Sequence, residues 1–116
     1  MGNPICHWEL MVNDVAKARA FYGRVFDWSF DTASPEYTMI NTGAPPGGGL
    51  MAKPPAAPTT ALNTYFAVAD IDATLRKVVE AGGTVAVPRT EIPGVGWFAM
   101  FVDPDQIPVG ILQSRT

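Results

Sequence analysis

The most constraining feature of this chain is a strand-and-helix pattern that occurs twice, 56 residues apart. Residues 5–12 alternate as a strand does, and Asn13 or Asp14 then caps an amphipathic helix that ends near Phe26. Placing Asp70 on Asp14 (70 − 14 = 56) brings a second apolar strand and a second helix into the same order. This repeat indicates two copies of one module, and since neither copy can bury its apolar faces alone, we expect them to pack together with the functional site between them. The second strand and helix are predicted over residues 64–68 and 71–81.

Three extended pieces follow each predicted helix. A repeat with only two strands for each helix would not account for them, which argues against such a fold. Each module is therefore predicted to read β-α-β-β-β. The predicted fold class is α+β, with two βαβββ modules that form curved mixed sheets around a cup. We predict a single domain over residues 1–116, in which module one (3–52) is joined by a proline-rich linker (53–61) to module two (62–114).

The composition is that of a globular chain and excludes several classes of function. Hydrophobic residues make up 47% of the 116 positions and charged residues 16%, which is too apolar for a disordered segment. The net charge is −3 and the basic residues are scattered, which argues against a nucleic-acid surface. A single cysteine excludes an internal disulfide. With no basic-then-apolar leader and no run of about 18 apolar residues, we expect a cytoplasmic protein with neither a membrane nor a nucleic-acid partner.

The first strand carries a titratable pair on one of its faces. Alternation places His7, Glu9 and Met11 on one side and an apolar set that begins with Cys6 on the other. Because a charged pair in mid-strand is unusual for a face buried in a core, we predict that His7 and Glu9 line the cup as catalytic candidates. The alternative is structural, with His7 hydrogen-bonded to Glu9 or to a backbone carbonyl, and Glu9 serving as a partner for nearby polar atoms.

The second copy offers neutral groups at the matching positions. Asn63 and Tyr65 correspond to His7 and Glu9, each 56 residues later, and are predicted to face the same cavity as ligand-binding residues. The alternative for Tyr65 is that its ring fills space with the hydroxyl at the rim.

The first helix carries an apolar stripe. Ala18, Phe21, Tyr22 and Val25 recur at the helical spacing i, i+3, i+4 and i+7. Such stripes are usually core, so Phe21, Tyr22 and Phe26 are predicted to be buried.

Several segments, taken in order, resemble the vicinal oxygen chelate superfamily of glyoxalases, bleomycin resistance proteins and extradiol dioxygenases. The similarity covers nearly the whole chain and implies paired βαβββ modules around a cup, usually in a homodimer. The segments that carry the resemblance are residues 7–14, 20–22, 25–28, 47–51, 94–99 and 103–105.

In catalytic members of that superfamily a divalent metal in the cup is held by side chains from four strands. The resemblance places those four positions on His7, Gly49, Asn63 and Gly110, of which only His7 is a good ligand. Glu9 lies about 6.6 Å along the strand on the same face and would make two. Catalytic zinc typically needs three protein ligands, so we predict no metal ligands and no metal cofactor.

The sequence therefore predicts a small-molecule-binding, glyoxalase-like protein without the classical metal site. It would sequester a small organic ligand or perform metal-free acid–base chemistry on it. Two alternatives stay open: a metal-dependent lyase or oxidoreductase of the glyoxalase or dioxygenase type, and a non-catalytic interaction module. Whether the chain is an enzyme is left open, and a homodimer is implied by the resemblance. The predicted catalytic residues are His7 and Glu9, and the predicted ligand-binding residues are Met11, Met51, Asn63, Tyr65 and Trp97.

Overall fold

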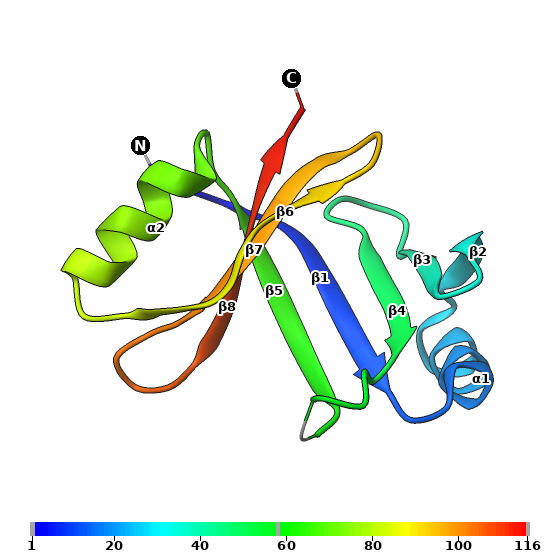
Figure 1. The fold of residues 1–116 in the computed structure, drawn as a ribbon. Helices are drawn as coiled ribbons and strands as arrows, with labels where there is room; N and C mark the ends of the chain where they lie inside the picture. Colours follow the sequence, from blue (N-terminus) through cyan, green and yellow to red (C-terminus); the bar gives the residue numbers. More distant parts are fainter. Residues whose placement is uncertain (1, 58, 116) are drawn as a thin grey trace. The chain divides into compact units, whose positions relative to one another are not determined.

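A computed structural model describes residues 2–57 and 59–115 and divides into two compact units (Figure 1). The first unit is residues 7–63, and the second unit joins residues 2–6 to residues 64–115. Strands and helices follow one another as two βαβββ series, which confirms the predicted α+β class. The first series is β1 (Ile5–Val12), α1 (Val15–Phe26), β2 (Ser29–Ser34), β3 (Tyr37–Asn41) and β4 (Gly48–Ala52). The second series is β5 (Ala61–Ala67), α2 (Ile71–Glu80), β6 (Thr84–Ile92), β7 (Gly96–Val102) and β8 (Pro108–Ser114).

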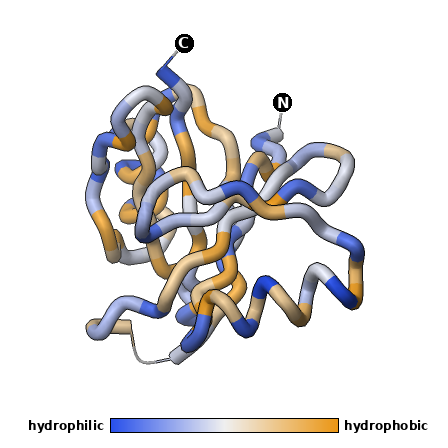
Figure 2. Tube along the Cα trace, turned by 90° about the vertical axis from the view of Figure 1, so that its right-hand side faces the viewer, coloured by the Kyte–Doolittle hydropathy of each residue, from blue (hydrophilic) through white to orange (hydrophobic). Residues whose placement is uncertain are grey.

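The two series repeat the same strand pairing. In the first, β1 pairs in parallel with β4, and β4–β3 and β3–β2 are antiparallel. In the second, β5 pairs in parallel with β8, and β8–β7 and β7–β6 are antiparallel. Figure 2 shows hydrophobic and hydrophilic segments alternating along the trace, as expected for strands with one face on a core. The shared order confirms that one module occurs twice, with a mixed sheet in each copy.

Both helices begin at the predicted acidic caps. The Asp14 carboxylate accepts the backbone N–H of Lys17 at 3.0 Å, and the Asp70 carboxylate accepts that of Ala73 at 3.1 Å. Each cap satisfies one of the N–H groups that a helix leaves without an internal partner. In the described part of the chain, no helix is long and apolar enough to cross a membrane.

The core of the second unit forms around Ile71, Ala99 and Ile111, which are almost fully buried. Phe66 and Phe101 pack against this cluster. These residues come from α2 and three strands, so burying them fixes the helix on its sheet.

The first unit has its deepest burial in the sheet rather than under its helix. Leu50 and Ile40 are 0% and 3% exposed, whereas no residue of α1 is buried. The prediction that Phe21 and Phe26 are core residues is therefore wrong, since they are 58% and 56% exposed. The helical period was correct, but the aromatic side chains of α1 pack on one another and on Trp28, just after the helix: the Tyr22 ring stacks on Trp28 at 5.3 Å.

Candidate functional site on the first unit

The sheet of the first unit presents one polar face, which the strand register defines. Glu9 pairs with Gly49, Gly49 with Met39, and Met39 with Asp31, so these positions form one row across β1, β4, β3 and β2. Paired residues point to the same side of a sheet, and alternation adds His7 to that side. Four further residues share this face by the same rule: Met11, Met51, Tyr37 and Asn41.

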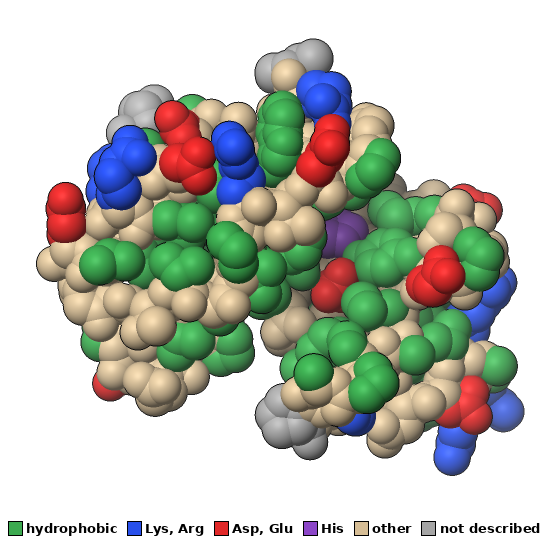
Figure 3. Space-filling model, viewed as in Figure 1, with side chains coloured by type: hydrophobic (Ala, Val, Ile, Leu, Met, Phe, Trp, Pro, Cys, Tyr) green, Lys and Arg blue, Asp and Glu red, His purple; other side chains and the backbone are tan. Residues whose placement is uncertain are grey.

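Three side chains on this face form a hydrogen-bonded chain. The Tyr37 hydroxyl oxygen lies 2.9 Å from His7 Nε2 and 2.9 Å from Glu9 Oε2. All three groups are partly buried, which strengthens the interaction relative to water. The structure therefore brings the two predicted catalytic residues together, through a tyrosine on another strand. Figure 3 shows the imidazole, in purple, reaching the surface on the face viewed.

The single hydroxyl proton of Tyr37 determines which groups donate and which accept in these two hydrogen bonds. An ionised Glu9 carboxylate can only accept, so Tyr37 donates to Glu9, and its oxygen then accepts an N–H from His7 Nε2. A neutral imidazole with its proton on Nε2 carries its lone pair on Nδ1. The arrangement thus favours a histidine whose basic nitrogen is Nδ1.

Glycine at position 49 makes room for the tyrosine. A Cβ placed on Gly49 would overlap the Tyr37 hydroxyl oxygen and Cζ, and would lie 2.6 Å from Cε2. The Tyr37 ring therefore occupies the space that a side chain at position 49 would need. Tyr37 is a site residue that the sequence analysis missed.

Beyond Tyr37 the same face is hollowed, next to the glycine-rich loop that joins β3 to β4. The hollow has a volume of about 370 Å³, within the range of small-molecule pockets. Its walls combine one carboxylate and one amide with apolar and backbone surface. The lining residues are Asp31, Met39, Ile40, Asn41, Gly43, Ala44, Pro45 and Gly47.

Burial changes the titration of the histidine. Loss of solvent around the ring lowers the pKa of His7 below 6.5, and the nearby Glu9 charge opposes this shift only in part. The neutral imidazole is therefore favoured in the folded chain near neutral pH.

This lowered pKa predicts a loss of stability in mild acid. The unfolded chain binds a proton at the ordinary histidine pKa near 6.5, whereas folded His7 takes it up only at lower pH. The His7 contribution to the free energy of unfolding should be complete above pH 6.5 and be lost as the pH falls through the folded pKa. Urea unfolding of wild type and His7→Gln from about pH 8 to about pH 5 measures it. The stability of wild type relative to the variant should decline in acid, and a constant difference would contradict the assignment.

The second unit repeats the tyrosine-over-glycine arrangement without the titratable pair. A Cβ on Gly110 would overlap Tyr65 Cδ2 and would lie 2.9 Å from the carbonyl oxygen of Thr64. The Tyr65 ring meets Phe98 edge-on at 6.4 Å. The Tyr65 ring therefore packs beside a glycine, and its role as a ligand-binding residue stays a prediction.

The other predicted ligand-binding residues are distributed over both units. Met11 and Met51 are register partners on the polar face of the first unit, and Asn63 is buried on β5. Trp97, in the second unit, has the Arg115 guanidinium over its ring at 4.8 Å. That residues of the two units contact one ligand, and that the chain forms a homodimer, stay predictions.

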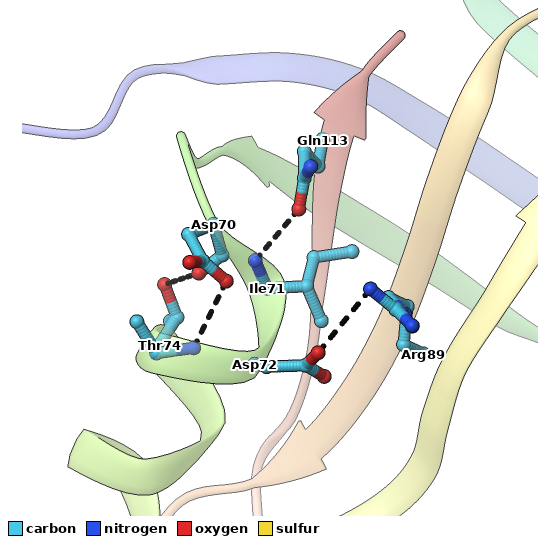
Figure 4. Close-up of polar contacts among 7 residues, drawn as sticks. Asp70, Ile71, Asp72, Thr74, Arg89 and Gln113 are labelled. Atoms are coloured by element: carbon cyan, nitrogen blue, oxygen red, sulfur yellow. Dashed lines mark hydrogen bonds and ion pairs between the residues drawn. The ribbon is translucent and has the colours of Figure 1, made fainter.

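Acidic residues around α2 have structural roles (Figure 4). Asp70 caps the helix, and the N–H of Ile71 donates to the Gln113 side-chain oxygen on β8 at 2.8 Å. Asp72 pairs with Arg89 at 3.2 Å, with both side chains half exposed. An exposed pair of this kind contributes little to stability. Among residues 2–57 and 59–115, no three His, Cys, Asp or Glu side chains are grouped as a metal site would need.

A βαβββ module that occurs twice in one chain gives this protein a glyoxalase-like α+β fold. The chain belongs to the Glyoxalase/Bleomycin resistance protein/Dioxygenase superfamily, whose family model matches residues 5–111. This confirms the resemblance seen in the sequence.

A curated relative supports the assignment, and two solved structures share the fold. A curated protein of Mycobacterium bovis, named "Putative glyoxylase CFP32", is 32% identical over 92% of this chain. The match covers 44% of that protein, so this chain spans about half the length of the curated relatives it matches. Methylmalonyl-CoA epimerase of Mycobacterium tuberculosis is similar in structure, with a TM-score of 0.77, 11% identity, and coverage of 97% of this chain and 89% of that chain. The Mn(II)-bound glyoxalase of Novosphingobium aromaticivorans gives a TM-score of 0.70 and 20% identity over 95% of this chain and 38% of that chain.

Proposed function

We propose that this chain binds a small organic molecule on the polar face of the first unit, and that it does so without a divalent metal. The observation that carries the proposal is the position of the Tyr37 hydroxyl, 2.9 Å from both His7 Nε2 and Glu9 Oε2. A metal bound to His7 Nε2 or Glu9 Oε2 would have to displace this hydroxyl from that atom.

The remaining side chains also fit a metal poorly. Gly49 offers no side chain, and the space beside it is filled by Tyr37. In the second unit, Gly110 is covered by the ring of Tyr65 in the same way. A catalytic metal typically takes three protein ligands, and harder divalent ions want several oxygens. His7 and Glu9 alone supply two donors, so no step of the proposed function passes through a metal.

The face is suited to a ligand that is mostly apolar with a few polar groups. Met11 and Met51 give it a flexible apolar surface beside the hydrogen-bonded chain. His7, Tyr37 and Glu9 supply an imidazole, a phenol and a carboxylate that can interact with polar groups of the bound molecule. Sequestration needs only these contacts, whereas acid–base chemistry would also need a proton to pass between these groups and the ligand.

Metal titration tests the proposal directly. Calorimetry with Zn²⁺, Ni²⁺, Mn²⁺ and Fe²⁺ should show no stoichiometric site that His7→Ala removes. Tight binding, with a Kd of about 1 μM or below, that is lost in His7→Ala would overturn the proposal in favour of a metal-dependent enzyme.

Compound binding supplies the positive evidence. In a fragment screen followed by ¹H NMR, bound compounds should shift the ring resonances of His7, the one histidine in the chain. Glu9→Gln should lower the affinity for such compounds about 10-fold, which is the effect of losing one charge-assisted hydrogen bond. Glu36→Gln, at an exposed carboxylate in the β2–β3 turn, is the matched control and should leave their binding unchanged. Hits that leave His7 unaffected would favour an interaction module instead.

A further inference from the structure

The hollow next to the β3–β4 loop contains a carboxylate with no partner in its own unit. Asp31 is exposed, and no hydrogen bond or ion pair involves its side chain among residues 2–57 and 59–115. Its register partner Met39 lies beside it, 39% exposed, and Pro45 closes the same hollow. A carboxylate at the edge of an apolar concavity attracts a positively charged group that carries an apolar arm.

Asn41 adds a donor with a defined orientation. Its side-chain oxygen accepts the backbone N–H of Gly43 at 2.8 Å, which fixes which end of the amide is the oxygen. The amide nitrogen is therefore the end that can donate to a ligand. The hollow thus combines an anionic acceptor, Asp31, with a neutral donor, Asn41.

The hollow belongs to the same sheet face as the hydrogen-bonded chain. Asp31 and Glu9 are the ends of one row that crosses four strands. Three strand spacings of about 4.8 Å separate them by about 14 Å, the length of an elongated small molecule. One ligand can therefore lie along the row, with one end at Glu9 and Tyr37 and the other end in the hollow.

We propose that this hollow binds an ammonium group through the Asp31 carboxylate, so that the ligand of the first unit is a small organic amine, with the Asn41 amide nitrogen free to donate to an acceptor elsewhere on it. The inference names the ligand class and rests on the binding function proposed above. Asp31 determines specificity for charge, and Met39 and Pro45 contact the apolar part of the amine.

Benzylamine is a suitable probe, with benzoate as its oppositely charged counterpart and benzyl alcohol as the neutral one. In ¹⁵N–¹H spectra, benzylamine should shift the amide signals of Asn41, Gly43 and Gly47 with a Kd of about 1 mM, as expected for a fragment. Benzoate should not shift them. Asp31→Asn should raise the Kd for benzylamine at least about 5-fold. Asp105→Asn, at an exposed turn of the second unit, should leave this Kd unchanged. Equal shifts with benzoate, or no effect of Asp31→Asn in a variant that keeps its folded spectrum, would overturn the inference.

The two proposals fail in different ways. If benzylamine does not bind but neutral fragments shift the His7 ring, the amine class is wrong and the binding function stands. If benzylamine shifts the amide signals of the hollow and a metal binds tightly through His7, the amine site stands and the metal-independent function is wrong.

Discussion

Replacing Gly49 with alanine should lower the free energy of unfolding by about 2–3 kcal/mol, although only one methyl group is added. The new Cβ would overlap the hydroxyl end of Tyr37, so the ring has to leave its position above β4. Moving the ring also breaks its hydrogen bonds to His7 and Glu9, and a bond to a charged group contributes about 1.5–3 kcal/mol. Urea unfolding of the variant measures the loss.

The matched control is Gly47→Ala, two residues earlier. A Cβ on Gly47 would approach only the carbonyl oxygen of Ile40, at 3.4 Å. We expect Gly47→Ala to change stability by less than about 1 kcal/mol.

A second substitution identifies the cause of the Gly49 effect. If the overlap with Tyr37 is responsible, Gly49→Ala should cost little in a Tyr37→Ala background, because the ring is then absent. The double-mutant cycle should give a coupling of about 1–3 kcal/mol. Additive effects would mean that Gly49 is needed for another reason and that Tyr37 does not occupy its side-chain space.

The fold was predictable because it depends on local patterns that repeat. The start of each helix follows from residue type and position, and the structure shows Asp14 and Asp70 as the residues that accept the capping N–H. Alternation placed His7 and Glu9 on one face of β1 without any knowledge of the neighbouring strands.

Tyr37 could not be found in the same way. Its contact with His7 and Glu9 depends on the register of β3 against β4, which is set by the intervening glycine–proline loop rather than by either strand. The sequence shows a glycine at position 49 but not the ring that covers it. One signal was present: a glycine on a strand often marks a close approach by another group. The same limit explains the α1 error, because periodicity predicts which residues share a stripe but not what lies opposite Phe21 and Phe26.

The most destabilising glycine substitution is expected in the second unit, where Gly96 begins β7. A Cβ on Gly96 would overlap the carbonyl oxygen of Gln113 and would lie 2.9 Å from Ser114 Cα. Its φ of 154° is also one that residues with a side chain rarely adopt. We expect Gly96→Ala to cost about 3 kcal/mol or more, measured by urea unfolding, because steric overlap adds to backbone strain.

Gly94, two residues away in the same turn, separates these two causes. Its φ is 77°, but nothing lies within 4 Å of the position a Cβ would take. Gly94→Ala should therefore cost only the strain of a left-handed residue, about 1–2 kcal/mol.

Gly96 also differs from Gly49 in what it touches: the atoms that crowd Gly96 belong to the backbone of β8, which pairs with β7 along its length. A side chain can be truncated to relieve an overlap, whereas a paired strand cannot move without losing its ladder. Replacing Gln113 or Ser114 by alanine should not restore the free energy of unfolding that Gly96→Ala loses. A recovery as large as that expected for Gly49→Ala in the Tyr37→Ala background would show that side chains crowd this turn instead.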